Sequence, residues 1–243
     1  MDTATETLAV AIGEGSEMIA CSSFRVLRGH SRILQPTISH LLQHTGIHID
    51  NITGIGVGIG PGSYTGVRLA VSTAKAMATT LSVPLYPVPT LFGIAEAARP
   101  GFPNRPSILL PMLFARRGRA FGAIYFKNTD GSYSTIKSSK VMPVLDWCKE
   151  AQTIQADSGA DLIVIHDFLP KHGVLGTLDI LQHRSVMTLQ SVSAALGPSF
   201  LHLVAAGAVS SVTGEEVHSV VPEYALEVEA ETKLRERRQG VHE

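Results

Sequence analysis

The order of apolar and polar residues along the chain predicts alternating strands and helices. Alternating or short apolar runs, which are typical of strands, occur at residues 8–13, 18–24, 54–60, 83–88, 107–114, 119–126 and 161–166. Apolar residues three and four positions apart, which are typical of helices, occur at residues 31–45, 64–81, 90–98, 143–151 and 191–210. Together these patterns indicate an α/β protein.

Residues 54–81 form the most distinctive stretch. Glycines at every second position from residue 54 to residue 60 leave one face of the predicted strand bare, so another backbone or a ligand can approach it closely. A tight turn follows, and Ser63 or Thr65 is suited to cap the helix behind it. In that helix small residues recur every four positions, which predicts a strip on which another helix lies: Gly66, Ala70, Ala74 and Ala78.

The turn before this helix has the backbone N–H groups that an anion requires, but it lacks a known phosphate motif. No Lys-Ser or Lys-Thr pair follows the glycines, as a Walker loop needs, and Ser63 stands where a dinucleotide fingerprint has its third glycine. A phosphate site and a purely structural turn both fit the residues.

Composition narrows the class of protein. The chain has 243 residues, 44% of them hydrophobic, and a formal net charge of −1, which argues against a broad basic surface for nucleic acid. Cys21 and Cys148 are isolated and fit a reducing compartment. Because there is no run of eighteen apolar residues and the start is polar, we expect a cytoplasmic protein.

Three prolines and a glycine between residues 98 and 106 predict a boundary between two units. We expect an N-terminal lobe over residues 1–98 and a smaller second lobe over residues 107–190. The helical pattern at residues 191–210, interrupted by Gly197-Pro198, is expected to pack back on the first lobe. Residues 227–243 mix Glu with Lys and Arg and predict a solvated tail.

The sequence offers no clear catalytic or metal site. His40, His44 and His48 have a spacing that metal ligands use, but surface histidines have it too, and we assign no metal. Neither G-x-S-x-G nor HExxH occurs, which disfavours a hydrolase. Carboxylates in the second half stand in loops or at the ends of elements and are assigned no catalytic role: Asp157, Asp161, Asp167 and Asp179.

Four stretches resemble one protein family. GPGSYTGVR from Gly60 resembles the signature of the TsaB (YeaZ) family, whose members take part in making threonylcarbamoyladenosine on bacterial tRNA. DTAT at residues 2–5 resembles its opening motif, HSRILQPTISHLL from His30 its first helix, and FARRGRAFGAIY from Phe114 the start of its second half. The resemblance covers most of residues 1–130 and then thins to VPEY from Val221. It implies a two-lobed actin/Hsp70-like (ASKHA, RNase H-like) fold, each lobe a mixed sheet with flanking helices.

The resemblance also implies a function. The chain is expected to be a noncatalytic scaffold whose helices at residues 31–45 and 64–81 bind the catalytic paralogue, TsaD. A TsaE-type ATPase would join through the complex, the chain alone would form a homodimer, and another subunit would hold the tRNA. The expected interface residues are Ile33, Leu34, Ile38, Leu41, Gly66, Ala70, Ala74 and Ala78.

Two departures from the family bear on the alternative, a phosphotransferase or ATPase acting alone with Asp2 and the Gly60–Gly66 turn at the phosphates. The family has an apolar strand before DTAT; here Met1 precedes Asp2, so either the sequence begins late or the sheet lacks a strand and exposes its neighbour's edge. Phe114 and Arg119 stand where the family has Asp and Glu, and their loss favours the scaffold.

No cofactor is required by the scaffold hypothesis, yet a weak ATP or ADP contact at the partner interface stays open. The residues that would make this contact are Gly60, Gly62, Ser63, Tyr64, Thr65, Gly66 and Arg68. Arg68 is equally suited to an interface salt bridge.

Overall fold

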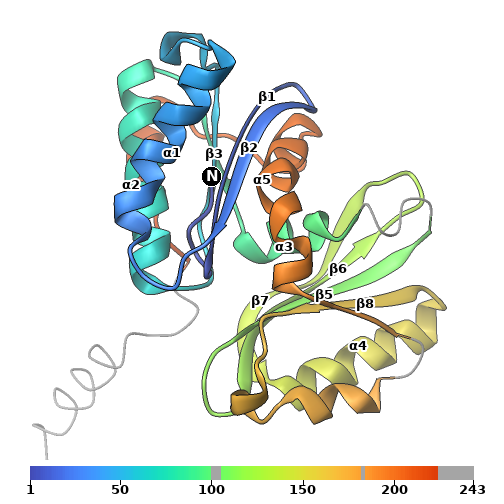
Figure 1. Ribbon diagram of the computed structural model, residues 1–243. Helices are drawn as coiled ribbons and strands as arrows, with labels where there is room; N and C mark the ends of the chain where they lie inside the picture. The colour runs from blue at the N-terminus through green and yellow to red at the C-terminus, as the bar shows by residue number, and fades with distance from the viewer. Residues whose placement is uncertain (100–104, 182–183, 224–243) are drawn as a thin grey trace, which may run out of the picture.

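The computed structural model describes residues 1–99, 105–181 and 184–223, which form two lobes (Figure 1). In the first lobe β1 (Thr7–Glu14) and β2 (Glu17–Arg25) form an antiparallel hairpin, and β3 (Ile55–Gly58) pairs in parallel with β4 (Leu85–Val88). The helices α1 (His30–Thr45), α2 (Tyr64–Leu81) and α3 (Thr90–Ala97) complete it. These elements were predicted from the sequence and are confirmed; Pro36 lies within α1 without ending it.

Met1 and Asp2 join the two small sheets of the first lobe. Asp2 exchanges backbone hydrogen bonds of 2.9 and 3.0 Å with Ala9 of β1. On the other side, the Met1 carbonyl accepts from the Gly58 N–H of β3 at 2.9 Å, and the terminal amine donates to the Gly56 carbonyl at 2.8 Å. The edge of β1 that a missing strand would leave exposed is therefore paired at Ala9.

The strip of small residues on α2 lies inside the lobe, which corrects the prediction that it is a surface for a partner. Ala70, Ala74 and Ala78 are at most 1% exposed and pack on Ile55, Val57 and Leu85 of β3 and β4. Small side chains let a helix lie close to a sheet just as they let it lie close to another helix. The sequence pattern alone does not distinguish these two neighbours.

The apolar stripe of α1 is buried in the same way. Leu34, Ile38 and Leu41 are at most 9% exposed and pack on Leu8 and Val10 of β1, while Ile33 is half-buried. The expected interface residues on α1 are thus mostly core, and the free surface of α1 and α2 is their opposite face. The two helices lie side by side on the side of the first lobe away from the larger sheet (Figure 1).

The second lobe is a five-stranded sheet with the order β7-β6-β5-β8-β9. Its strands are β5 (Ser107–Phe114), β6 (Arg119–Lys127), β7 (Tyr133–Pro143), β8 (Asp161–His166) and β9 (Arg184–Thr188). Helix α4 (Val144–Ser158) covers one face, where Trp147 is fully buried among apolar side chains of β5, β6 and β8. Helices α3 and α5 cover the other face, so the sheet is buried on both sides.

Helix α5 (Leu189–Ala205) returns to the first lobe and packs on β1, β2 and α3. It runs through Gly197-Pro198 without interruption and ends at Ala205, short of the predicted residue 210. Gly197 is the point of close approach, because a Cβ there would lie 3.2 Å from that of Ala11. Short 3-10 turns occupy Ile49–Asn51, Pro170–His172, Leu175–Ile180 and Gly214–Ser219.

Two sequence predictions lie wholly or partly outside the described residues. They are the boundary at residues 98–106, of which residues 100–104 are not described, and the charged tail at residues 227–243. Within the described part of the chain, no helix has both the length and the apolar character needed to cross a bilayer.

Candidate functional site

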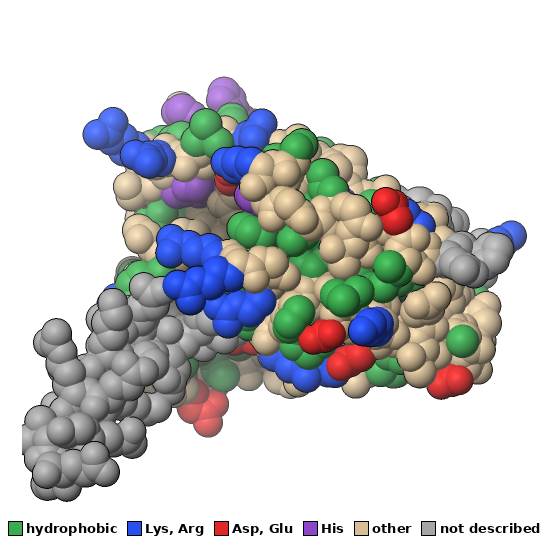
Figure 2. Space-filling model, turned by 90° about the horizontal axis from the view of Figure 1, so that it is seen from below, with side chains coloured by type: hydrophobic (Ala, Val, Ile, Leu, Met, Phe, Trp, Pro, Cys, Tyr) green, Lys and Arg blue, Asp and Glu red, His purple; other side chains and the backbone are tan. Residues whose placement is uncertain are grey.

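A cleft with a volume of about 1240 Å³ opens between the two lobes. The first lobe contributes residues 4–6, 26–31, 62–69 and Ser72 to its wall. The second lobe contributes residues 113–117, Arg119, Phe121 and Asp167, and Glu223 completes the lining. On the face seen in Figure 2, Lys or Arg side chains and His side chains gather beside a hollow.

The glycine turn before α2 is packed by the chain's own first residues. Ser63 caps α2 by accepting from the Gly66 N–H, and its own N–H donates to the Ala4 carbonyl at 2.6 Å. The Thr3 hydroxyl donates to the Gly66 carbonyl at 2.6 Å, and a Cβ at Gly66 would lie 2.0 Å from the Thr3 carbonyl oxygen. Close approach of residues 2–4 therefore accounts for Gly58, Gly62 and Gly66, and for Gly58 this is the close approach that the bare strand face had suggested.

The predicted nucleotide-contact residues divide into two groups. Residues 62–66 and Arg68 line the cleft, whereas Gly60 does not. The Gly60 N–H instead donates to the Thr90 hydroxyl at 3.1 Å inside the lobe. Of the N–H groups in the predicted anion cup, those of Gly60, Ser63 and Gly66 already have partners in the protein.

Asp2 lies behind the cleft rather than in its wall. The side chain is fully buried, and its Oδ2 accepts from the Thr90 hydroxyl at 2.8 Å while Oδ1 accepts from the Ala4 N–H at 3.0 Å. Burial raises the pKa of this carboxyl group. Asp2 thus ties the opening motif to α3 and does not line the cleft, where the enzyme hypothesis needs it.

On the opposite wall, Phe114 occupies the position at which the resembled family has Asp. Its ring stacks on the imidazole of His172, with centroids 3.8 Å apart and planes 7° from parallel. Asp167 lies beside it and accepts from the Phe114 N–H at 2.7 Å. Sequence reasoning gave Asp167 no role; the signal available was its place just after β8, where the carboxyl ends of the parallel strands β5 and β8 meet.

Asp167 should give the stability of the protein a measurable pH dependence. Burial raises the pKa of Asp167 from 3.8 to about 6, so between these values the folded state binds more protons than the unfolded state. The protonated form of Asp167 therefore stabilises the folded state. This contribution to the free energy of unfolding is fully present below about pH 4 and is lost as pH rises through about 6.

Asp167→Asn should therefore gain stability relative to the wild type as pH rises from 4 to 7, by at most about 3 kcal/mol. Urea unfolding of both proteins over this range measures the difference. A difference that does not change with pH would contradict the raised pKa.

Five arginines line the cleft, and none forms an ion pair with a described residue: Arg28, Arg68, Arg116, Arg117 and Arg119. Arg68 donates to the Tyr64 hydroxyl at 2.6 Å and lies 5.1 Å from the centre of that ring. Arg116 and Arg117 have φ values of 65° and 50°, which side chains other than glycine rarely adopt. Both form the exposed tip of the β5–β6 hairpin.

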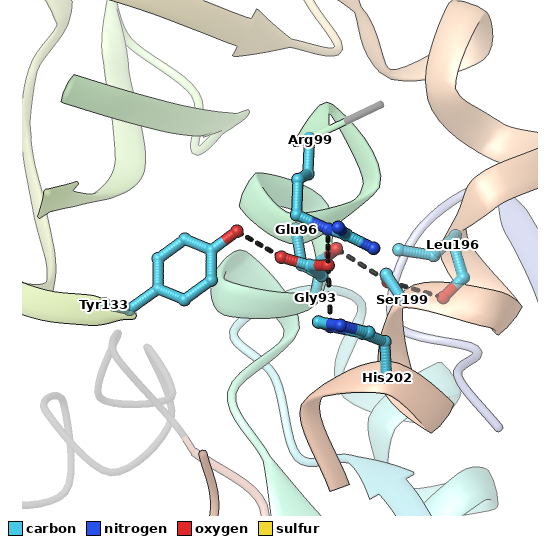
Figure 3. Close-up of polar contacts among 7 residues, drawn as sticks. All are labelled: Gly93, Glu96, Arg99, Tyr133, Leu196, Ser199 and His202. Carbon is cyan, nitrogen blue, oxygen red and sulfur yellow. Dashed lines mark hydrogen bonds and ion pairs between the residues drawn. The ribbon is translucent and has the colours of Figure 1, made fainter. Parts of the chain in front are cut away.

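A second polar cluster joins α3, α5 and β7 away from the cleft (Figure 3). Glu96, only 2% exposed, accepts from the Arg99 Nε at 2.5 Å and from the Tyr133 hydroxyl. The Nδ1 of His202 lies 2.9 Å from the same carboxylate. Glu96 therefore contacts one residue just after its own helix, one of α5 and one of the second lobe's sheet.

No three His, Cys, Asp or Glu side chains among the described residues gather closely enough to hold a metal ion. The rings of His40 and His44 face each other at 6.2 Å on the exposed side of α1. That the chain binds no metal therefore stays a prediction.

The two lobes and the cleft between them give the chain a two-lobed α/β fold. A solved structure titled YeaZ from Pseudomonas aeruginosa has the same fold, with a TM-score of 0.69, 22% identity, and coverage of 92% of this chain and 96% of that one. The family model of TsaD, described as tRNA N6-adenosine threonylcarbamoyltransferase, matches residues 25–160.

Two relatives are similar along the sequence. The tRNA threonylcarbamoyladenosine biosynthesis protein TsaB of Bacillus subtilis is 27% identical over 241 residues, 96% of this chain and 95% of the relative. TsaB of Escherichia coli is 29% identical over 143 residues, 58% of this chain and 60% of the relative. The chain belongs to the TsaB (YeaZ) family, which is related to TsaD, and the resemblance noted in the sequence is confirmed.

Proposed function

We propose that this chain is a noncatalytic scaffold subunit of the machinery that forms N6-threonylcarbamoyladenosine on tRNA, and that it binds and activates a TsaD-type catalytic subunit. Family membership supports the pathway. The observation that carries the scaffold role is the set of carboxylates in the cleft, because phosphoryl transfer in a two-lobed fold needs acids there to hold metal and orient the attacking group.

The carboxylates that line the cleft are poorly suited to that chemistry. Glu6 forms an ion pair with Arg25 at 3.1 Å, and Asp167 is engaged by the Phe114 N–H. The third, Glu223, is half-buried, and burial raises its pKa. With Asp2 behind the wall, the first lobe supplies no free acid opposite Asp167, so the scaffold role is favoured over a phosphotransferase or ATPase acting alone.

The outer face of α1 and α2 is the surface that we assign to the catalytic subunit. A groove of about 530 Å³ lies between the C-terminal part of α1, the segment after it and α2. Its apolar lining is Ile38, Leu42, Ile47, Ile49 and Met77. We propose that a TsaD-type subunit covers this groove, that a TsaE-type ATPase joins through the complex, and that a second copy of this chain covers the groove when no partner is present.

Ile49→Arg should weaken the complex with the TsaD-type protein of the same organism by at least about tenfold, because a charge would be buried without a partner. Ile49 is 39% exposed, so the fold should tolerate the change. Ile136→Arg is the matched control, since Ile136 is 48% exposed on β7, outside the groove. Chromatography with light scattering measures the masses of each protein alone and of the mixtures.

The wild-type chain is expected to change from a homodimer to a one-to-one complex, and Ile136→Arg should behave in the same way. If the wild type forms no complex and its homodimer is untouched, the scaffold proposal is wrong. ATP binding and hydrolysis by the chain alone, through residues 62–66 and Arg68, would then be measured next, because the enzyme hypothesis would lead.

A further inference from the structure

We propose that the cleft between the lobes binds a single-stranded segment of RNA directly, through arginines on both of its walls. The inference takes the class of ligand, RNA, from the proposed function. It changes one expectation, namely that another subunit alone holds the tRNA.

The arginines of the cleft have no acidic partner among the described residues. Of the five arginines elsewhere in the described chain, four pair with carboxylates and Arg32 does not: the pairs are Arg25 with Glu6, Arg99 with Glu96, Arg105 with Asp161 and Arg184 with Asp179. The five that line the cleft have no such pair within residues 1–99, 105–181 and 184–223, where only Arg68 is engaged, by the neutral Tyr64 hydroxyl. Guanidinium groups left unpaired in a concave surface attract phosphate groups.

These arginines lie on both walls of the cleft. Arg28 and Arg68 belong to the first lobe, whereas Arg116, Arg117 and Arg119 belong to the second. A ligand that engages both walls must therefore carry several negative charges spaced along its length, as a nucleic-acid backbone does. The cleft, at about 1240 Å³, exceeds the roughly 300–1000 Å³ of pockets for small molecules, so a single nucleotide would leave part of it unfilled.

The first turns of two helices add positive potential on the first-lobe wall. Helix α1 begins at His30 and α2 at Tyr64, both cleft residues, and neither helix has an acidic residue in its first turn. No acidic side chain of the first turn therefore neutralises the positive end of either helix dipole. The Nε2 of His30 is buried without a hydrogen-bond partner in the described structure, which leaves one more polar atom at the cleft to be satisfied.

Aromatic and apolar side chains stand among these charges. Tyr64 is 48% exposed, Leu27 is 71% exposed, and the half-buried rings of Phe114 and Phe121 also line the cleft. Proteins that hold single strands combine a basic groove with aromatic surfaces on which unpaired bases stack. In a duplex the bases are stacked on one another, so these side chains favour a single strand.

The net charge of −1 led us to expect that RNA contacts this chain only indirectly. That charge is a sum over the whole chain, and the charge at the cleft differs from it. The lining of the cleft has five arginines and three acids, Glu6, Asp167 and Glu223, and Glu6 is paired with Arg25 outside the cleft. The cleft is consequently more basic than the sequence average.

The test uses the full chain and a fluorescently labelled single-stranded RNA of about 12 nucleotides, a length within the site sizes of small single-strand-binding folds. Fluorescence anisotropy over a salt series gives the affinity and its salt dependence, whose slope is about 0.7 per phosphate contacted on a single strand. The double variant Arg116→Gln/Arg117→Gln should lower the slope by about 1.4 and weaken binding at low salt at least about tenfold.

Controls separate this result from misfolding and from nonspecific charge loss. Arg105→Gln removes an arginine whose side chain is 79% exposed outside the cleft and should bind as the wild type does. Arg116→Lys/Arg117→Lys keeps the charges and should keep the slope, and circular dichroism should show both double variants folded.

The proposal is overturned if the wild-type chain does not bind the RNA at low salt, if Arg105→Gln loses as much affinity as the cleft variant, or if a duplex of the same sequence binds equally well. Binding of ATP without binding of RNA would also overturn it. Light scattering with the TsaD-type partner is read separately, so loss of RNA binding with an intact complex leaves the scaffold proposal standing.

Discussion

Arginine in place of Ala70 is expected to unfold the first lobe. Ala70 is fully buried on the face of α2 that packs against β3 and β4. The substitution would place a long side chain where the core has room for one methyl group, and overpacking costs about 1–3 kcal/mol. Removing its charge from water without a partner adds several kcal/mol. The sum approaches the whole stability of a typical domain, about 5–15 kcal/mol.

Urea unfolding monitored by circular dichroism measures this effect, and Ser72→Arg is the matched control on the same helix. Ser72 is exposed, so its variant should stay within about 0.5 kcal/mol of the wild type. A folded Ala70→Arg protein that fails to self-associate would instead mean that the strip of small residues is a surface, as the sequence pattern had suggested.

The residues of this strip show how far the sequence could be read. Their four-residue spacing correctly predicted α2 and its close packing, because spacing determines which side chains share a face. It did not reveal the neighbour on that face. The neighbour is the β3–β4 pair, and this pairing depends on contacts between segments far apart in the chain.

The two strands that sequence reasoning did not predict, β7 and β9, are the two edges of the five-stranded sheet. Central strands are covered on both faces and read as apolar runs, as SILLPMLF in β5 does. Edge strands carry polar and charged residues that limit pairing with other chains, and YSTIKSSKVMP in β7 has this character. Such segments lack the pattern by which a strand is recognised.

The candidate site was predictable only in part for a related reason. The glycine turn and Arg68 could be placed at the cleft because they belong to one local motif. Asp167 and the β5–β6 hairpin tip come from separate strands of the other lobe, and only folding brings them opposite the turn. Asp2 was expected at the phosphates of the glycine turn, but it lies behind the wall of the cleft, where its carboxylate accepts from the Thr90 hydroxyl.

Removal of the buried carboxylate by Glu96→Ala is expected to lower the free energy of unfolding by about 3–5 kcal/mol. Glu96 is 2% exposed and accepts from Arg99 and Tyr133, so two groups would lose their shared acceptor, and its carboxylate lies 2.9 Å from the Nδ1 of His202. The charged form of Lys127, which is only 1% exposed, would also be less stable. Burial and Arg99 lower the pKa of Lys127, and Glu96 opposes this.

Two further variants separate the charge of Glu96 from its hydrogen bonds, each measured by urea unfolding at neutral pH. Glu96→Gln keeps the shape and an acceptor oxygen and should lose less than Glu96→Ala, whereas Tyr133→Phe removes one hydrogen bond and should lose about 1 kcal/mol. A loss under about 1 kcal/mol for Glu96→Ala would contradict the cluster's structural role. Because the cluster joins α3 and α5 to β7, a large loss would mean that this carboxylate stabilises the junction that keeps the two walls of the cleft facing each other.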